Sequence, residues 1–327
     1  MYNGPVLYAV DAMTGLDFVN ALSDSQRREG FLEKYHLDGE KVLAASAKKS
    51  DLKKAAKKRY VCDHKQIREQ PTSFAREIFQ IADVKTLFGY LNEQFFYTQH
   101  MGFKGSIRLS LEKGHERAVK LHGQIEALKT EILENHWFDC RGVLQFFSAY
   151  SEGDTLVLLD QGGNPLKKIP FPRQASGEML CAADFVGDRD KRVLDCVGVF
   201  AVTTGSKVRE VAQRLKDSGD YLKSHGVQAL AVETAEAFAE YIHHQMRQKL
   251  GIEENLTLKE MVQTKYQGIR LSFGYPACPD LNGQRDLFEL IKPEEAGIQL
   301  TESMMMDPEG SVSALVFSHP QAKYFGV

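Results

Sequence analysis

Residues 227–250 carry the pattern that most constrains the fold. In "VQALAVETAEAFAEYIHHQMRQKL", apolar or small side chains recur at helical spacing, at Ala231, Thr234, Ala235, Phe238, Ile242, Met246 and Leu250. A stripe of this kind predicts a long helix with one face buried against another layer. The run "RVLDCVGVFAVTTG" at 192–205 can form that layer, because it predicts a strand buried on both faces. We therefore expect a long helix packed on a sheet.

Other segments add to both layers. Helical spacing predicts helices over 84–99, 115–136 and 206–226, the second with apolar positions at Val119, Ile125, Leu128 and Ile132. Short apolar runs predict strands over 141–150, 154–160, 181–186 and 311–319. Because strands and helices come in clusters rather than in strict alternation, the sequence favours an α+β domain from about residue 76 to 327.

The first 75 residues have a different character. "VLYAV" at 6–10 predicts a strand and residues 15–35 predict a helix, so residues 1–37 form either the end of a larger α/β domain or an arm. Residues 38–75 are rich in lysine and poor in large apolar side chains. We favour a solvated linker there over a docking surface for an acidic partner.

Composition excludes several classes of protein. The net charge of -3 gives no indication of nucleic-acid or anionic-membrane binding. The sequence contains no apolar run of the roughly 18–20 residues that span a bilayer, and the N-terminus does not resemble a signal peptide. The five cysteines are scattered and never occur as CxxC, which is typical of a reducing cytoplasm.

Well-known catalytic and metal-binding motifs are also missing. "QGGNPLKK" fits neither common phosphate-loop spacing, and in "HERAV" a valine, Val119, takes the place of the second histidine of a zinc site. His243 and His244 are adjacent on the predicted helix and point in different directions. The sequence therefore predicts neither a bound metal nor a residue acting in acid–base catalysis.

The stretch "RLSFGYPACPDL" at 270–281 predicts a rigid loop instead of a helix or strand. Arg270 offers a planar fork suited to a carboxylate or phosphate, and Gly274 permits a positive φ. Glu236 and Glu240 lie one turn apart, off the apolar stripe, which by pattern alone favours a solvated face. If they face Arg270 across a cleft, the three would suit a zwitterion with extra positive charge, and Tyr324 could be either a core aromatic or part of that site.

Five stretches within residues 76–327 resemble the S-adenosylmethionine-binding reactivation domain of cobalamin-dependent methionine synthase. They are "RGVLQFFSAYSEGD", "GVFAVTTG", "AEAFAEYIH", "YQGIRLSFGYPACPD" and "LTESMMMDPEGSVSALVFSHPQAKYF". They occur in the family's order, and the R-x-x-x-G-Y-P-A-C-P element is highly specific. The resemblance implies a C-shaped α+β domain with an antiparallel or mixed sheet and long helices, which binds its ligand in a shallow groove.

The resemblance also implies ligand contacts. Arg270 matches the arginine that holds the ligand's carboxylate. The backbone of Leu271 and Ser272 falls where the family contacts the adenine and ribose end. Glu236 matches a glutamate near the ligand's sulfonium and amino group.

Two tyrosines match the family and one polar residue departs from it. Tyr324 matches a tyrosine beside the ligand, and Tyr275 matches one that reaches toward the corrin. The family usually reads Y-I-D-W, whereas this chain reads "YLNE", with Asn92 at the aspartate and Glu93 at the tryptophan. Asn92 brings no charge to an ammonium, which could cost about 1–2 kcal/mol unless Glu93 compensates. The family's P-A-N is replaced by residues 148–150, "SAY".

The implied function is supply of the methyl group of S-adenosylmethionine for reductive reactivation of cob(II)alamin. Its implied partners are a cobalamin-binding domain or subunit of methionine synthase, which holds the cobalamin, and a flavodoxin-type electron donor. Residues 1–37 resemble the last strand and helix of such a cobalamin domain. The alternatives are a non-catalytic S-adenosylmethionine-binding or docking subunit, and an independent methyltransferase. The latter is disfavoured because no glycine-rich nucleotide loop is found.

Overall fold

The computed structural model describes residues 18–19, 21–24, 26–33, 60, 62–63, 70–191, 194–252 and 254–327. The chain divides into two units, residues 1–58 and residues 59–327. In the smaller unit, the helical residues 18–19 and 21–23 are separated from the helical residues 28–33 at Asp24. The Asp24 side chain accepts a hydrogen bond from the amide of Gln26 (2.9 Å). The helix predicted over 15–35 is therefore interrupted, and the strand predicted at 6–10 lies outside the described residues.

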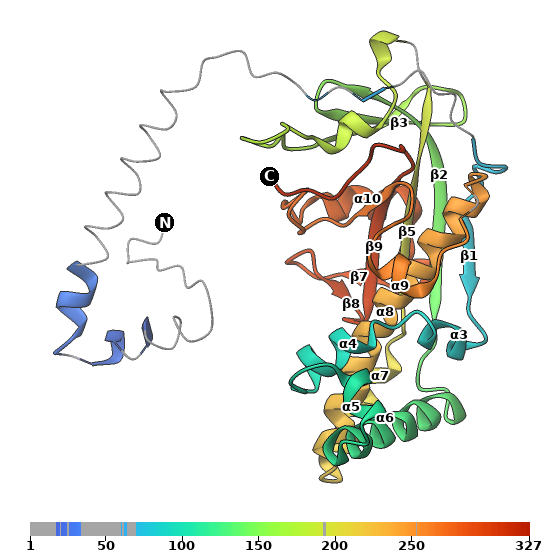
Figure 1. Cartoon of the computed structure of the whole chain (residues 1–327). Coiled ribbons are helices and arrows are strands. Elements are labelled where there is room, and N and C mark those ends of the chain that lie inside the picture. Colours follow the sequence, from blue (N-terminus) through green and yellow to red (C-terminus); the bar gives the residue numbers. More distant parts are fainter. Residues whose placement is uncertain are drawn as a thin grey trace. The chain divides into compact units, whose positions relative to one another are not determined.

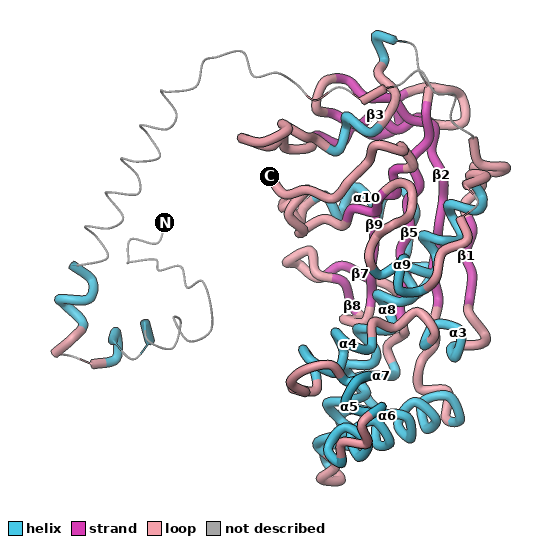
Figure 2. Tube along the Cα trace, in the orientation of Figure 1, coloured by secondary structure: helices cyan, strands magenta, loops and turns pink. Residues whose placement is uncertain are grey.

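The larger unit is built on a seven-stranded sheet, drawn in Figures 1 and 2. Six strands follow the order β4-β3-β2-β5-β9-β6, β1 also pairs with β2, and every pair of strands in this sheet is antiparallel. The strands are β1 (Glu77–Gln80), β2 (Arg141–Glu152), β3 (Thr155–Leu159), β4 (Pro165–Pro170), β5 (Asp195–Thr203), β6 (Ile269–Leu271) and β9 (Ser311–Phe317). A separate two-stranded sheet joins β7 (Gln299–Leu300) to β8 (Met306–Asp307).

Helices cover the sheet, and the longest runs across β5 and β9 (Figure 1). That helix is α8 (Tyr221–Lys249). The other α-helices are α3 (Val84–Phe88), α4 (Glu93–Phe95), α5 (Ile107–Glu112), α6 (Glu116–Glu134), α7 (Lys207–Asp217), α9 (Leu258–Val262) and α10 (Gly283–Ile291). A π-helix, η1 (Phe96–His100), continues α4, and short 3-10 helices are η2 (Ala182–Phe185), η3 (Arg189–Lys191) and η4 (Pro293–Ala296). The α+β prediction is confirmed.

The strand β5 separates two hydrophobic clusters because its side chains alternate between the faces of the sheet. Phe200 and Val202 belong to the cluster that contains α8, whereas Val199 and Ala201 belong to the cluster that contains α10. Gly198 lets α8 approach closely, because a Cβ there would lie 2.2 Å from Met246 Cε. The prediction of a strand buried on both faces is confirmed, and so is the buried stripe of the long helix.

Three element predictions are wrong, each because of a local hydrogen bond. The helices predicted over 206–226 and 227–250 are instead divided at Gly219 (φ 84°), after which the Asp220 side chain caps α8 through the amide of Lys223. The helix predicted over 84–99 ends at Phe88 and restarts after Asn92, whose Oδ1 accepts from the amide of Phe95 (3.2 Å) and caps α4. The strand predicted at 181–186 is the 3-10 helix η2, because the Asp184 carboxylate accepts from the amide of Cys181 (2.9 Å).

One residue of the predicted helix 115–136 also departs from expectation. Ile125, Leu128 and Ile132 are buried, but Val119 is 50% exposed, because it lies on the outer side of α6.

Residues 60, 62 and 63, at the end of the predicted linker, belong to the larger unit. Cys62 is buried in the cluster that contains α10, and Tyr60 packs against it. The amide of Asp63 donates to Gln321 Oε1 (2.8 Å), near the C-terminus. The proposed domain boundaries stay predictions, but these contacts attach the segment before residue 76 to the domain core. Residues 39–59, which hold most of the predicted linker's lysines, lie outside the described residues.

Candidate functional site

Arg270 occupies the middle of β6, the strand at one edge of the sheet. Val316 of β9 is its register partner, and 19% of the Arg270 side chain is exposed. Its guanidinium crosses to α8, where Nη1 donates to Glu240 Oε2 and Nη2 lies 3.9 Å from Glu236 Oε2. The structure therefore brings together the arginine and the two glutamates that the sequence pairs only as one of two interpretations.

The two glutamates differ in exposure. Glu240 is buried, with 8% of the residue exposed, whereas 43% of the Glu236 side chain is exposed. The interpretation as a solvated helix face is wrong for Glu240, which is buried and bonded to the Arg270 side chain that reaches it from β6. Glu236 remains open to a ligand.

A tight turn after β6 fixes the direction of Arg270. The amide of Gly274 (φ 90°) donates to the carbonyl of Cys278 (2.9 Å), and the amide of Cys278 donates back to the carbonyl of Tyr275 (2.9 Å). The Ser272 carbonyl accepts from Cys278 Sγ (2.9 Å) and from the amide of Tyr275 (3.3 Å). From Ser272 on, the prolines and Gly274 form the rigid loop that the sequence predicts. The prediction is wrong for Arg270 and Leu271, which belong to β6 because their backbone pairs with Val316 and Leu315 of β9.

The tyrosines of the predicted site lie at its rim. Tyr275 and Tyr324 are 58% and 44% exposed. The Tyr324 hydroxyl accepts from the amide of Arg270 (3.3 Å) and is 2.9 Å from the hydroxyl of Tyr266. Tyr324 is therefore not a core aromatic but a residue bonded to the backbone of Arg270. Leu271 is buried and pairs in register with Leu315.

Charge and burial set the titration of these groups. Burial disfavours the charge of Arg270, but Glu240, Tyr266 and Tyr324 together raise the pKa of its guanidinium above the usual value. Burial, helped by repulsion from Glu233 and Glu240, raises the pKa of the Glu236 carboxyl, against the pull of Arg270. The charge of Glu236, followed by burial, raises the pKa of the Tyr275 phenol.

Asn92 caps a helix in this structure. It is the N-cap of α4, and its Oδ1 accepts from the amide of Phe95 (3.2 Å). Within the described part of the chain, no hydrogen bond or ion pair joins Asn92 to Arg270, Glu236 or Glu240. Glu93, the residue that could compensate, lies 3.5 Å from Lys129 of α6.

Sequence reasoning missed a second arginine beneath this site. Arg247 of α8 is 1% exposed, its Nε donates to Glu254 Oε2 (3.0 Å), and its Nη1 lies 3.9 Å from Glu240 Oε1. We refer to Arg247, Arg270, Glu236, Glu240 and Glu254 as the arginine–glutamate cluster. The available signal was the high density of charged residues on a helix that is buried almost all round.

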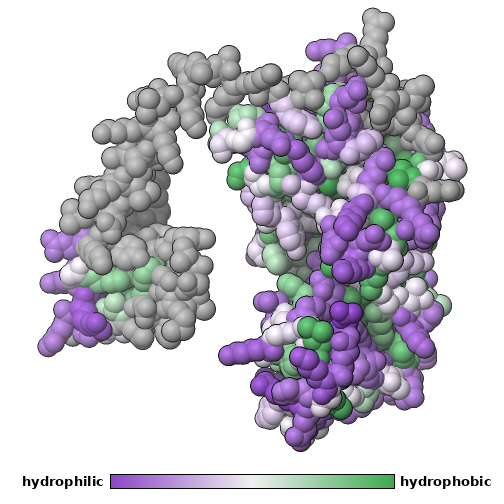
Figure 3. Space-filling model, viewed as in Figure 1, coloured by the Kyte–Doolittle hydropathy of each residue, from purple (hydrophilic) through white to green (hydrophobic). Residues whose placement is uncertain are grey.

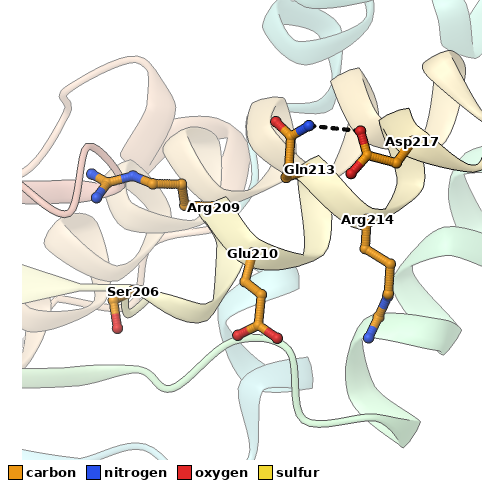
Figure 4. Close-up of a pocket in the computed structure, with 6 residues that line it drawn as sticks. All are labelled: Ser206, Arg209, Glu210, Gln213, Arg214 and Asp217. Atoms are coloured by element: carbon orange, nitrogen blue, oxygen red, sulfur yellow. Dashed lines mark hydrogen bonds between the residues drawn. The ribbon is translucent and has the colours of Figure 1, made fainter.

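Two hollows of the described surface lie away from this site. One of about 670 Å³ follows α7, lined by Ser206, Arg209, Glu210, Gln213, Arg214 and Asp217 (Figure 4). Another of about 760 Å³ lies beside α10 and η4. Neither is lined by a predicted site residue. All six side chains in Figure 4 come from one helix or the residue preceding it, so that hollow lacks the converging groups of a built site.

Three further observations concern the described residues. No group of three or more histidine, cysteine, aspartate or glutamate residues there could hold a metal ion. No described helix is both long and apolar enough to cross a membrane. All five cysteines are buried, and burial raises the pKa of the Cys278 thiol to about 12.

Residues 83–327 match the sequence family described as the activation domain of vitamin B12-dependent methionine synthase. The chain belongs to this family. It is 28% identical over 370 aligned positions to methionine synthase of Mycobacterium tuberculosis (strain ATCC 25618 / H37Rv), and 28% identical over 377 positions to that of Mycobacterium leprae (strain TN). Both alignments cover the whole chain but 30% of the relative, so the chain spans less than a third of these proteins.

A solved structure agrees with this assignment. The crystal structure of the MetH reactivation domain bound to AdoHcy is 27% identical in sequence, with a TM-score of 0.76. The superposition covers 82% of this chain and 90% of that domain. The fold of an activation domain is therefore confirmed by both sequence and structure.

Proposed function

We propose that this chain binds S-adenosylmethionine and presents its methyl group for the reductive reactivation of cobalamin in methionine synthase. Membership of the activation-domain family supports this proposal. So does the related reactivation domain, which was solved with AdoHcy, the molecule left when S-adenosylmethionine gives up its methyl group. The activity of the whole synthase remains a proposal for this chain, which spans 30% of its relatives.

The observation that carries the proposal is the arrangement of Arg270 with two glutamates at the "RLSFGYPACP" loop. Glu240 engages Nη1 of Arg270, so Nε and Nη2 can meet a carboxylate from outside. A planar guanidinium binds carboxylates with two parallel hydrogen bonds, which a lysine cannot do. Arg270 therefore suits the carboxylate of an amino-acid ligand, and Glu236 its ammonium or sulfonium.

The charge of the cluster supports the same ligand. Three carboxylates face two guanidinium groups, which leaves one negative charge in excess when all are ionised. His243, one turn from Arg247, stays neutral, because burial and the neighbouring arginines lower its pKa well below the usual value. S-adenosylmethionine carries two positive charges and one negative, so its net charge complements that of the cluster.

The remaining predicted contacts extend the site along β6. We propose that the backbone of Leu271 and Ser272 meets the adenosine end, that Tyr324 lies beside the ligand, and that Tyr275 faces the corrin. Asn92 would accept a hydrogen bond from the ligand's ammonium. When bound, S-adenosylmethionine supplies an electrophilic methyl group and cobalamin supplies the reduced cobalt that receives it. This chain's own residues only orient and neutralise the methyl donor, so none needs to act as an acid or base.

We propose two partners and a compartment on the same basis. The first partner is a cobalamin-binding domain or subunit of methionine synthase, and the second is a flavodoxin-type electron donor. The exposed ring of Tyr275, at the rim of the site, suits contact with a corrin-bearing domain. Five scattered, buried cysteines that never occur as CxxC suit the reducing cytoplasm.

Calorimetric titration of S-adenosylmethionine into the purified chain tests the proposal. We expect micromolar-range binding that Arg270→Ala abolishes. Because that variant leaves Glu240 buried without its cation, Arg270→Lys is the better-matched change, since it keeps the charge but loses the fork. Binding that both variants retain would contradict the site, and no binding by the unaltered chain would contradict the function.

A second assay separates reactivation from the alternative of a non-catalytic subunit. A supplied cobalamin-binding domain of methionine synthase, a reducing system and methyl-labelled S-adenosylmethionine are mixed with the chain. Label on the cobalamin supports reactivation. Ligand binding without transfer supports the non-catalytic subunit instead.

A further inference from the structure

Arg247 is a charged residue that the proposed ligand contacts leave unexplained. It lies on α8 with 1% of its surface exposed. Its guanidinium carbon is 4.3 Å from the centroid of the Tyr266 ring, and its Nε donates to Glu254 (3.0 Å). Among the described groups, neither Nη1 nor Nη2 has a hydrogen-bond partner. Burying a guanidinium with so few hydrogen bonds is costly, so packing alone is a poor reason to keep an arginine there.

One connection runs from Arg247 to the site through Glu240. The Glu240 carboxylate lies between two guanidinium groups, with Oε2 on Arg270 and Oε1 3.9 Å from Arg247 Nη1. Glu240 is 8% exposed, so its charge is screened little by solvent. The positive charge of Arg247 therefore favours the carboxylate orientation that holds Arg270 on its other side.

A second connection runs through Tyr266. Arg247 stacks on its ring, which is 7% exposed, and the Tyr266 hydroxyl is 2.9 Å from that of Tyr324. Tyr324 in turn accepts from the amide of Arg270 (3.3 Å). Burial raises the pKa of Tyr266, so its phenol keeps the proton that this chain of hydrogen bonds needs.

Arg247 is also linked, through Glu254, to the backbone before β6. Glu254 accepts from Arg247 through Oε2 and from the amide of Gln267 through Oε1 (2.5 Å). Gln267 precedes β6 by two residues. The segment from α9 to β6 is therefore anchored to α8 at the same arginine.

We propose that Arg247 is a positioning residue for the candidate site, which holds Arg270 in place through Glu240 on one side and through Tyr266 and Tyr324 on the other. It makes no ligand contact itself. This inference rests on the proposed function, because the geometry it maintains is that of the proposed carboxylate-binding fork. Tyr266, likewise unassigned by the sequence, is the middle of the second connection.

The test uses three single variants of the full chain and a double variant that combines the first two. Tyr266→Phe keeps the ring under Arg247 but removes the hydroxyl, and Arg247→Lys keeps the charge but loses the planar stack. Arg189→Lys is the matched control, because Arg189 also lies over a tyrosine, Tyr150 (5.7 Å), and is not part of the cluster. Each is measured by calorimetric titration with S-adenosylmethionine, by thermal unfolding, and by the ¹H–¹⁵N resonance of the Arg270 amide without ligand.

We expect Tyr266→Phe to weaken binding about three- to tenfold, the effect of one hydrogen bond, with little change in melting temperature. Arg247→Lys should weaken it about tenfold or more. The variant that combines Tyr266→Phe with Arg247→Lys should fall short of the product of the two single effects, because both disturb the connection through Tyr266 and Tyr324. The Arg270 amide should shift in both variants and stay in place in Arg189→Lys.

Two results would overturn the inference: an unshifted Arg270 amide in both variants, or fully additive binding losses. A lowered melting temperature with an unshifted amide would make Arg247 a packing residue only. Failure of the unaltered chain to bind S-adenosylmethionine would instead overturn the proposed function. The amide shifts would then still support the positioning role, because they are measured without ligand.

Discussion

At the scale of single residues, the site combines groups whose charges are costly in the unliganded fold. Glu236 is the clearest case, because burial and two neighbouring carboxylates raise the pKa of its side chain. Such a carboxyl binds its proton more tightly in the folded than in the unfolded chain. It therefore adds stability below its unfolded pKa, and this contribution is lost as the pH rises through its folded pKa. At neutral pH a ligand cation would relieve that cost.

We predict that Glu236→Gln stabilises the fold near neutral pH while weakening ligand binding. The melting temperature should exceed that of the unaltered chain at pH 7, and the difference should shrink toward pH 4, where Glu236 takes up its proton. S-adenosylmethionine should bind about tenfold more weakly, since an amide carries no charge. Thermal unfolding and calorimetry at both pH values check this, and equal affinities at pH 7 would exclude Glu236 from the site.

At Asn92 we predict a substitution that strengthens ligand binding. Aspartate caps helices as well as asparagine does, so Asn92→Asp should keep the hydrogen bond to the Phe95 amide. It should also add a charge for the ligand's ammonium and tighten binding of S-adenosylmethionine about fivefold or more. Asn92→Ala is the control, expected to lose about 1 kcal/mol of stability with the cap and to gain no affinity. Unchanged affinity in Asn92→Asp would remove residue 92 from the ligand contacts.

At the scale of elements, the site depends on where β6 lies against β9 and α8. β6 is only three residues long, so the backbone on either side of it fixes its position. Gly268 precedes it with φ 84°, and a Cβ there would lie 2.4 Å from the carbonyl oxygen of Phe317 at the end of β9. No other residue type fits this approach without moving one strand.

We therefore predict that Gly268→Ala destabilises the domain by more than about 2 kcal/mol and also weakens binding of S-adenosylmethionine. Gly153→Ala is the matched control: its φ is 63°, but no atom lies within 4 Å of the added Cβ, so only the backbone strain of about 1–2 kcal/mol is expected. Denaturant unfolding compares the two. Equal losses would mean that the contact with β9 has no cost of its own.

At the scale of the whole molecule, the larger of the two units contains both the sheet and the candidate site. The unit of residues 59–327 holds the seven-stranded sheet, both hydrophobic clusters and all the predicted site residues. Figure 3 shows hydrophilic and hydrophobic side chains interspersed on its visible face. A unit with its own core is expected to fold by itself.

We predict that residues 59–327 alone unfold cooperatively and bind S-adenosylmethionine within about twofold of the full chain. Residues 76–327 should be less stable, because they lack buried Cys62 and the hydrogen bond from Asp63 to Gln321. Circular dichroism melting curves of the three chains check this. Equal stability of the two truncated chains would mean that residues 59–75 contribute nothing to the domain.

The sequence by itself determined the elements whose side-chain pattern is regular over many residues. β2, β5 and β9 follow from short apolar runs, and α6 and the buried stripe of α8 follow from a period of 3.6 that reflects local backbone geometry. The loop at 272–281 was also readable, since proline fixes its own φ and Gly274 permits the positive φ that the turn requires. A highly specific motif then indicated the family.

Only the tertiary structure decided which charges are buried and what they meet. By pattern Glu240 faced solvent, and Arg247 and Tyr266 were not assigned to the site. In the structure Glu240 bonds Arg270, Arg247 lies against Glu240 and Tyr266, and Tyr266 bonds Tyr324. The division between α7 and α8, the cap formed by Asn92 and the turn of η2 likewise depend on single hydrogen bonds. The physical reason is that burial and pairing join residues far apart in the chain. The approach of Arg270 in β6 to Glu240 in α8 brings these residues together. No local sequence pattern encodes which residues from distant parts of the chain will meet.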